Sequence, residues 1–221
     1  MGLDMYLEKT KRVEGITPDQ LIILNNYFAF LKRPESDRNF SMKEWCGCNI
    51  EDVNLDMAKN YISEYIHRYS SWDIEKAYGF KTIFQSVAVW RKANHIHKWF
   101  VNNIQSGNDD CGTYEVSKEM LSNLIEICKQ VKAASNLIKG KIQNGYTYKN
   151  GVESPIWVEG EYIENSSIAA VLLPTQEGFF FGGTEYDQWY MEDINYTITT
   201  LEKIVNETDF NHEIVMYSSS W

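Results

Sequence analysis

The order in which strand-like and helix-like patterns follow one another constrains this chain most. In residues 2–8, Gly-Leu-Asp-Met-Tyr-Leu-Glu, the apolar Leu3, Met5 and Leu7 occupy every second position. This period of two predicts a half-buried β-strand. Later segments do not alternate as regular βαβ units, so we expect an α+β domain over residues 1–221. It would be a small, mainly antiparallel sheet packed with four to five helices.

Capping signals and helical periodicity indicate where the helices begin. Thr17 is a candidate N-cap, followed by Pro18 at the first helical position, and Gln20 completes a capping box. Pro34 closes that segment. We expect further helices at about 54–69, from near Ser86 to the turn at 106–112, at 118–135 after Ser117, and at 185–205 with Thr184 as N-cap.

The remaining segments have strand and turn chemistry. Residues 113–116 and 212–221 are typical of strands, and residues 166–183 are predicted to form two strands joined by a turn. Between about 139 and 165 the chain contains two Asn-Gly pairs, at 144 and 150. Asn-Gly is favoured in tight hairpin turns. We therefore expect a Gly/Asn-rich hairpin insertion there.

Charge and hydropathy exclude several classes of protein. The net charge of −10 argues against direct nucleic-acid binding, which needs a surplus of basic residues on one face. No apolar run approaches the roughly 20 residues of a membrane span, and no secretory signal is evident. We expect a soluble, cytoplasmic protein. The acidic character could reflect solubility alone, or a surface that imitates nucleic acid toward a basic partner.

The four cysteines are too few and too unevenly spaced for a disulfide framework. Cys46 and Cys48 form a C-x-C, but the paired C-x-x-C of a zinc knuckle is absent. Cys111, Cys128 and His67 could only complete such a site by chance proximity. We expect buried thiols and predict no metal site and no cofactor.

The segment Trp-Arg-Lys-Ala-Asn-His-Ile-His-Lys-Trp-Phe, residues 90–100, is predicted to be helical, so His95 and His97 point apart and cannot share a metal ion. His95 falls on the polar face and is expected to face solvent. Asn94 and His97 fall at the edge of the core, where they need hydrogen-bond partners. They are either structural ties or ligand contacts. The apolar stripe of this helix consists of Val89, Ala93, Ile96, Phe100 and Ile104.

The second informative stretch is the junction at residues 174–190, where aromatic residues stand beside carboxylates. Phe179, Phe181, Tyr186, Trp189 and Tyr190 could form an aromatic core or a pocket that stacks on a flat ligand. Glu185 and Asp187 would offset the helix dipole and repel a bound phosphate. Neither a G-x-G-x-x-G motif nor a P-loop is present.

Signatures of catalysis are absent from the sequence. There is no G-x-S-x-G elbow and no H-E-x-x-H motif. Glu192 and Asp193 are adjacent, but neighbouring residues of a helix diverge, so this pair is expected to be a solvated face. We predict no catalytic residue and expect binding rather than catalysis.

Five stretches together resemble a family of small proteins found mainly in bacteriophage and prophage genomes. They are Met-Gly-Leu-Asp-Met-Tyr-Leu at the start, residues 90–101, residues 109–121, residues 172–190 and Tyr-Ser-Ser-Ser-Trp at the end. The resemblance implies an accessory role, such as inhibition of a host defence system, and carries no established reaction.

We therefore expect a phage accessory protein that acts by binding. The first hypothesis is sequestration of a nucleotide-like signalling molecule, to counter host defence. Its ligand-binding residues would be Arg91, Asn94, His97, Glu185, Tyr186, Asp187, Trp189 and Tyr190. The alternatives are an acidic inhibitor of a host protein, or a metal-assisted enzyme acting on a small phosphate-containing molecule. Homo-oligomerisation is left open.

Overall fold

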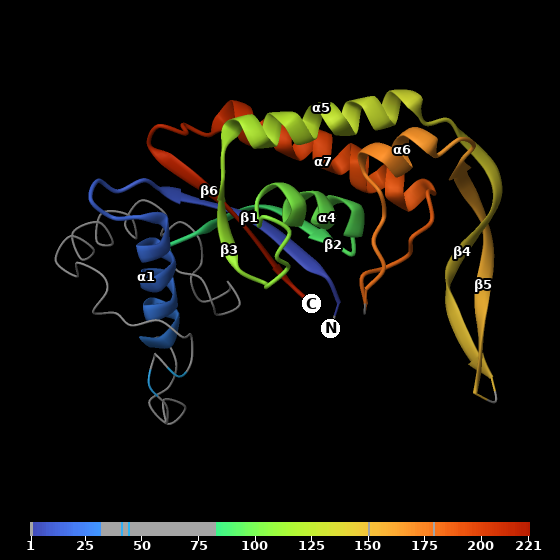
Figure 1. Cartoon of the computed structure of the whole chain (residues 1–221), viewed down its shortest axis with the longest axis horizontal. Coiled ribbons are helices and arrows are strands. Elements are labelled where there is room, and N and C mark those ends of the chain that lie inside the picture. The colour runs from blue at the N-terminus through green and yellow to red at the C-terminus, as the bar shows by residue number, and fades with distance from the viewer. Residues whose placement is uncertain (1, 32–40, 42–43, 45–82, 150, 179) are drawn as a thin grey trace. The chain divides into compact units, whose positions relative to one another are not determined.

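A computed structural model of the chain describes residues 2–31, 41, 44, 83–149, 151–178 and 180–221. Its elements, drawn in Figure 1, are β1 (Asp4–Lys11), α1 (Pro18–Leu31), β2 (Gln85–Arg91), α4 (Asn94–Asn103), β3 (Thr113–Val116), α5 (Lys118–Ala134), β4 (Leu137–Lys149), β5 (Val152–Ile163), α6 (Ser167–Leu172), α7 (Gln188–Glu207) and β6 (Glu213–Ser220). Several expectations lie outside the described residues, namely the helix at about 54–69, Pro34, Cys46, Cys48, His67 and Phe179.

The strands form one sheet of four and one of two. The four-stranded sheet has the order β2-β1-β6-β3, and β4 pairs only with β5 among the described strands. β3 and β6 are antiparallel. At the ends of β1, the Lys92 N–H donates to the Leu3 carbonyl and the Arg12 N–H to the His212 carbonyl. The start of β1 therefore lies beside the end of β2, and its end beside the start of β6. These pairings confirm the α+β class.

The chain divides into two compact units. The large unit comprises Met1–Leu7, Val87–Phe210 and Val215–Trp221, and the small unit comprises Glu8–Ser86 and Asn211–Ile214. In the small unit, Thr17 and Gln20 exchange hydrogen bonds of 2.9 and 3.3 Å. The capping box at the start of α1 is therefore confirmed.

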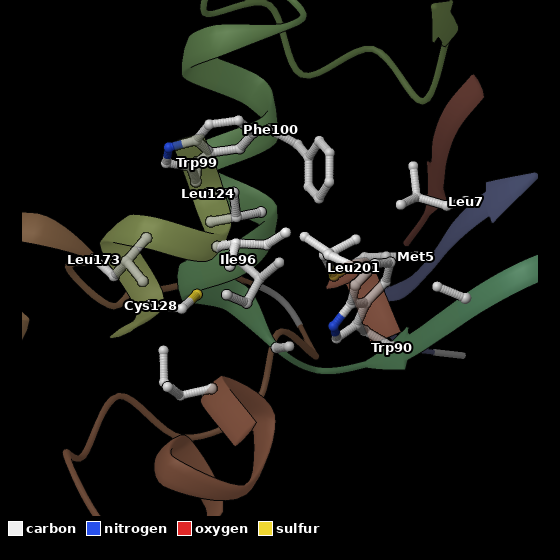
Figure 2. Packing of buried hydrophobic residues seen from close by; sticks show 14 of the residues in the cluster. Met5, Leu7, Trp90, Ile96, Trp99, Phe100, Leu124, Cys128, Leu173 and Leu201 are labelled. Atoms are coloured by element: carbon white, nitrogen blue, oxygen red, sulfur yellow. The ribbon is translucent and has the colours of Figure 1, made fainter. Parts of the chain in front are cut away.

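The core of the large unit confirms the expected face of the first strand. Leu3, Met5 and Leu7 are fully buried. Figure 2 shows β1 and β2 meeting the helices, with side chains that interdigitate between them. The core residues labelled there are Met5, Leu7, Trp90, Ile96, Trp99, Phe100, Leu124, Cys128, Leu173 and Leu201. α5 packs along α7, and the Phe100 and Tyr217 rings stack at 4.0 Å.

The structure corrects the prediction of a helix that begins near Ser86. Residues 85–91 form β2, and α4 begins only at Asn94. Near the end of β2, Trp90 is buried whereas Val89 is 47% exposed, so Val89 is not part of a helical stripe. Lys92, which lies between the strand and the helix, has a φ of 61°, and this left-handed conformation interrupts the regular secondary structure. β-branched residues and period-two burial outweigh the helical pattern here.

The structure also corrects the prediction of two strands in residues 166–183. Ser167–Leu172 forms the short helix α6, which starts where the Ser167 N–H donates to the Asn165 side chain at 3.1 Å. A short apolar run cannot be assigned to strand or helix by periodicity alone. In this run the Ala and Leu residues favour the helix.

The N-cap of the last helix also differs from the expected Thr184. The Asp187 side chain accepts hydrogen bonds from the Trp189 and Tyr190 N–H groups at 3.0 and 3.2 Å, so Asp187 caps α7. The Thr184 carbonyl instead accepts a bond of 3.0 Å from the Thr175 hydroxyl. Aspartate and threonine are both good N-caps, and in the structure the Asp187 side chain supplies the cap.

Other local predictions are confirmed. The hydroxyl of Ser117 caps α5 at 3.2 Å from the Met120 nitrogen, and β3 and β6 lie where strands were expected. β4 and β5 form one hairpin. Gly151, with a φ of 79°, lies at its turn, and Gly145, with a φ of 85°, lies at a break in register between Gln143 and Tyr146. Asn144 and Gly145 therefore lie at a bulge, and Gly151 of the second Asn-Gly pair lies at the turn.

Candidate functional site

Asn94 ties the start of α4 to the junction before α7. Its side-chain nitrogen donates to the carbonyls of Phe181 and Gly183 at 3.2 and 2.8 Å. Its side-chain oxygen accepts from the Gln176 N–H at 2.9 Å. The two segments expected to enclose a ligand therefore lie in contact. Both amide hydrogens and the oxygen of this buried residue already have protein partners.

His97 occupies the centre of a second polar network. Its ring nitrogens lie 2.7 Å from the Tyr217 hydroxyl and 3.0 Å from an Asp109 carboxylate oxygen. The other Asp109 oxygen accepts from the Trp221 indole at 3.1 Å. The network thus joins α4, the loop after it and the end of β6.

An imidazole held between a carboxylate and a hydroxyl has the arrangement of a catalytic relay. Here, however, His97 and Tyr217 are fully buried. Burial raises the pKa of the Tyr217 hydroxyl, which keeps it protonated. Because both ring nitrogens are engaged, His97 can orient its neighbours but has no free atom for a ligand.

His95 does not face solvent, which corrects the expectation from helical periodicity. Its ring is 3% exposed and lies against Tyr190 of α7, with centroids 4.1 Å apart. Its Nε2 has no hydrogen-bond partner among the described residues. Burial lowers the pKa of His95 from 6.5 to about 3, so the ring is neutral near pH 7. α4 is covered on nearly all sides, and periodicity cannot identify a polar face in such a helix.

The remaining predicted residues divide between core and surface. Arg91 is exposed on β2, and its Nε lies 3.8 Å from an Asp4 oxygen. Tyr190 is buried and donates its hydroxyl to the Leu173 carbonyl at 3.0 Å. The half-buried Tyr186 accepts from the Thr175 N–H at 3.3 Å. Glu185 is exposed.

Four carboxylates gather at the start of α7. Glu185 and Glu192 are exposed and Asp193 is half-buried, whereas Asp187 is only 5% exposed. We call Glu185, Glu192 and Asp193, together with the 37% exposed Trp189, the acidic surface. The pKa of Asp187 is raised by burial and by the charge of Glu185. The pKa of Asp193 is raised to about 7, first by burial and then by Glu192 and Asp187. Asp193 is therefore half-buried and not part of a fully solvated face, which corrects the expectation for this residue.

The cysteines offer no activated thiol in the described part of the chain. Burial raises the pKa of Cys128 to about 12. The pKa of Cys111 is raised by desolvation and by the carboxylates of Asp109 and Asp110. Thiols with raised pKa values are poor nucleophiles at neutral pH. Among the described residues, no three His, Cys, Asp or Glu side chains converge as a metal site.

Sequence reasoning missed the partners of His97 and the environment of Asp193. Asp109 and Tyr217 lie 12 and 120 residues from His97. A histidine at the core edge signals that partners exist but does not identify them. For Asp193, the signal in the sequence was the presence of Asp187 and Glu192 nearby. The effect of these acids on the pKa of Asp193 depends on how deeply the group is buried.

No protein-family model matches this chain. No curated protein and no solved structure matches it either. None of the helices in the described residues is long and apolar enough to span a membrane.

Proposed function

We propose that this protein acts by binding a basic site on another protein through the acidic surface at the start of α7. The observation that supports this most is the mutual repulsion of its carboxylates. The pKa values of Asp193 and of the neighbouring, buried Asp187 are raised first by burial and then by the charges of nearby acids. A lysine- or arginine-rich partner would relieve this repulsion, and that relief would add to the attraction between opposite charges.

The position of Trp189 suits such an interface. It projects from the first turn of α7 beside Asp187 and is partly exposed. Tryptophan is enriched among the residues that dominate interface energies, because its large side chain is desolvated on contact. Glu185 and Glu192 would supply charged contacts around it.

The hydrogen bonds that Asn94 and His97 already make to the protein argue against capture of a nucleotide-like ligand between α4 and α7. Five hydrogen-bond contacts to protein atoms already occupy their side chains. A ligand would have to break contacts that hold the junction, β6 and α4 together, and each break would leave a buried polar group unsatisfied. Such a ligand would have to rely on Arg91, Glu185 and Trp189 instead.

In the setting implied by the phage-family resemblance, the partner would be a host protein whose basic site is blocked. Binding would then depend strongly on ionic strength. It would also strengthen as pH rises from about 6 to 8, because Asp193 with a pKa of about 7 must lose its proton to meet a cation.

The test is capture of partners from bacterial lysate with the full chain immobilised, in low and high salt. The variant Glu185→Gln/Glu192→Gln/Asp193→Asn removes charge from the acidic surface. The matched control, Glu119→Gln/Glu126→Gln/Glu207→Gln, removes three acidic side chains elsewhere. We expect a basic protein to be retained by the wild type and the control, and lost from the first variant and in high salt.

Equal capture by both variants would contradict the proposal. Native mass spectrometry of the purified wild type provides a separate outcome. A nucleotide bound in stoichiometric amount would favour the small-molecule hypothesis and reject the acidic surface as the principal site.

A further inference from the structure

The β4–β5 hairpin carries several large aromatic side chains that are exposed to solvent. At its base it is anchored to the start of α7 within the large unit. The Ile163 N–H donates to the Tyr186 carbonyl at 2.9 Å, and the Glu161 N–H to the Gln188 side chain at 2.9 Å. Toward the tip, Tyr146, Tyr148 and Trp157 are 54%, 71% and 56% exposed. Figure 1 shows the two strands running together well beyond the end of α7 to which their base is attached.

The register places these three aromatic side chains on one face. Trp157 pairs with Gln143, Pro155 with Tyr146, and Glu153 with Tyr148. Directly opposite residues share a face, and so do alternate residues of one strand. We call this the aromatic face of the hairpin. Exposed clusters of this kind mark interaction sites, and an isolated two-stranded hairpin is only marginally stable without cover.

The same face carries both signs of charge, one on each strand. Lys139 and Lys141 of β4 lie opposite Glu161 and Glu159 of β5, respectively. The whole segment 137–163 contains three lysines and three glutamates, so it is neutral within a chain of net charge −10. This neutral, two-sign pattern complements neither a basic nor an acidic surface. It does complement itself.

Symmetry then decides how two copies would meet. A two-fold axis parallel to the strands and lying between two stacked aromatic faces places β4 of one copy over β5 of the other. Lys139 of each copy then faces Glu161 of its mate, and Lys141 faces Glu159. Edge-to-edge two-fold pairing would instead bring lysine rows or glutamate rows together, which is unfavourable. Pro155 also lacks an N–H and makes β5 a poor edge for further strands.

We propose that the chain forms a homodimer by stacking the aromatic faces of two hairpins. Each copy would contribute roughly 400 Å² of now-exposed surface from its three aromatic side chains, given the usual 150–250 Å² of such groups. With the flanking charged stems, the total lies near the lower limit for specific interfaces, which is typical of weak, reversible association. The base of the hairpin adjoins the start of α7, where Tyr162 forms a β-bridge with Asp187. The aromatic face nevertheless shares no residue with the acidic surface, so separate variants let the two proposals fail independently.

Sedimentation velocity of the full chain from about 1 to about 200 µM tests the proposal. We expect the wild type to shift from monomer to dimer within this range. Tyr146→Ser/Trp157→Ser should raise the dissociation constant by at least about tenfold. The matched control is Ile156→Ser, which changes an exposed apolar residue of the same strand on the opposite face and should leave the dimer intact.

Charge reversal tests whether the molecule that covers the aromatic face is a second copy of this chain. Lys139→Glu/Lys141→Glu and Glu159→Lys/Glu161→Lys should each abolish self-association, and an equimolar mixture should recover a dimer. Circular dichroism checks that each variant is folded. A wild type that stays monomeric, a dimer indifferent to Tyr146→Ser/Trp157→Ser, or a mixture that stays monomeric would each overturn the proposal.

Discussion

Replacing His95 by Phe should make the protein more resistant to acid. The phenyl ring can keep the contact with Tyr190, while the buried Nε2 that lacks a partner among the described residues is removed. In the folded chain the pKa of His95 is lowered from 6.5 to about 3 by burial. Between these values the unfolded chain binds a proton that the folded chain does not, so the stability contributed by neutral His95 is lost as pH falls below about 6.5.

The magnitude follows from the two pKa values. At pH 8 the ring is neutral in both states, whereas at pH 5 it is protonated only in the unfolded state. The linkage relation gives a loss of about 2 kcal/mol in the free energy of unfolding between pH 8 and pH 5. His95→Phe should remove this loss.

Asp193 changes the free energy of unfolding in the opposite direction as pH falls. In the wild type alone it would therefore hide the effect of His95. The folded pKa of Asp193 is raised from 3.8 to about 7, so its contribution is fully present below about pH 4 and is lost as pH rises through 7. From pH 8 to pH 5 it adds about 2 to 3 kcal/mol, nearly cancelling the loss from His95. Asp193→Asn should accordingly stabilise the protein at pH 8 and change stability less at pH 5.

The assay is urea unfolding of the wild type and both variants at pH 5 and pH 8. The decisive quantity is the change in free energy of unfolding between the two pH values, because it cancels any packing difference introduced by Phe or Asn. The reasoning is refuted for His95 if wild type and His95→Phe show the same change. It is refuted for Asp193 if wild type and Asp193→Asn show the same change.

Two further substitutions probe the packing of the large unit, each by urea unfolding at pH 7. Thr197→Val removes the acceptor 2.9 Å from the buried Trp90 indole and should cost about 1–3 kcal/mol; a change below about 0.5 kcal/mol would show that this bond is unimportant. Gly182→Ala adds a Cβ only 2.9 Å from that of Lys92, at a φ of +97°, and should cost about 1–3 kcal/mol. Gly183→Ala meets nothing within 4 Å and is its control; equal losses would reject the steric argument.

Local signals in the sequence predicted those elements that are set by interactions between residues only a few positions apart. The capping box at Thr17 and the cap at Ser117 each depend on a side chain and a nitrogen three residues away. The first strand followed from its alternation, and the β4–β5 hairpin from its Asn-Gly pairs. Interactions of such short range operate in the same way in almost any surrounding structure.

Local patterns were less decisive where short apolar segments suited both strand and helix. Residues 85–91 and 167–172 were assigned to the wrong type, and the cap of α7 was placed at Thr184 instead of Asp187. For residues 85–91 a neighbour distant in sequence contributes to the outcome, because β2 pairs with β1. Thr184 contacts a residue nearer in sequence, since its carbonyl accepts from the Thr175 hydroxyl.

For the candidate site, the sequence by itself determined which groups needed partners, and only the tertiary structure decided which partners they have. Asn94 and His97 had to be satisfied wherever they were buried. Their bonds to Phe181, Gly183 and Tyr217 depend on how β6 and the junction approach α4. Hydrogen bonding and burial act over a few ångströms in space, irrespective of separation along the chain, so their outcome is set by the assembled fold.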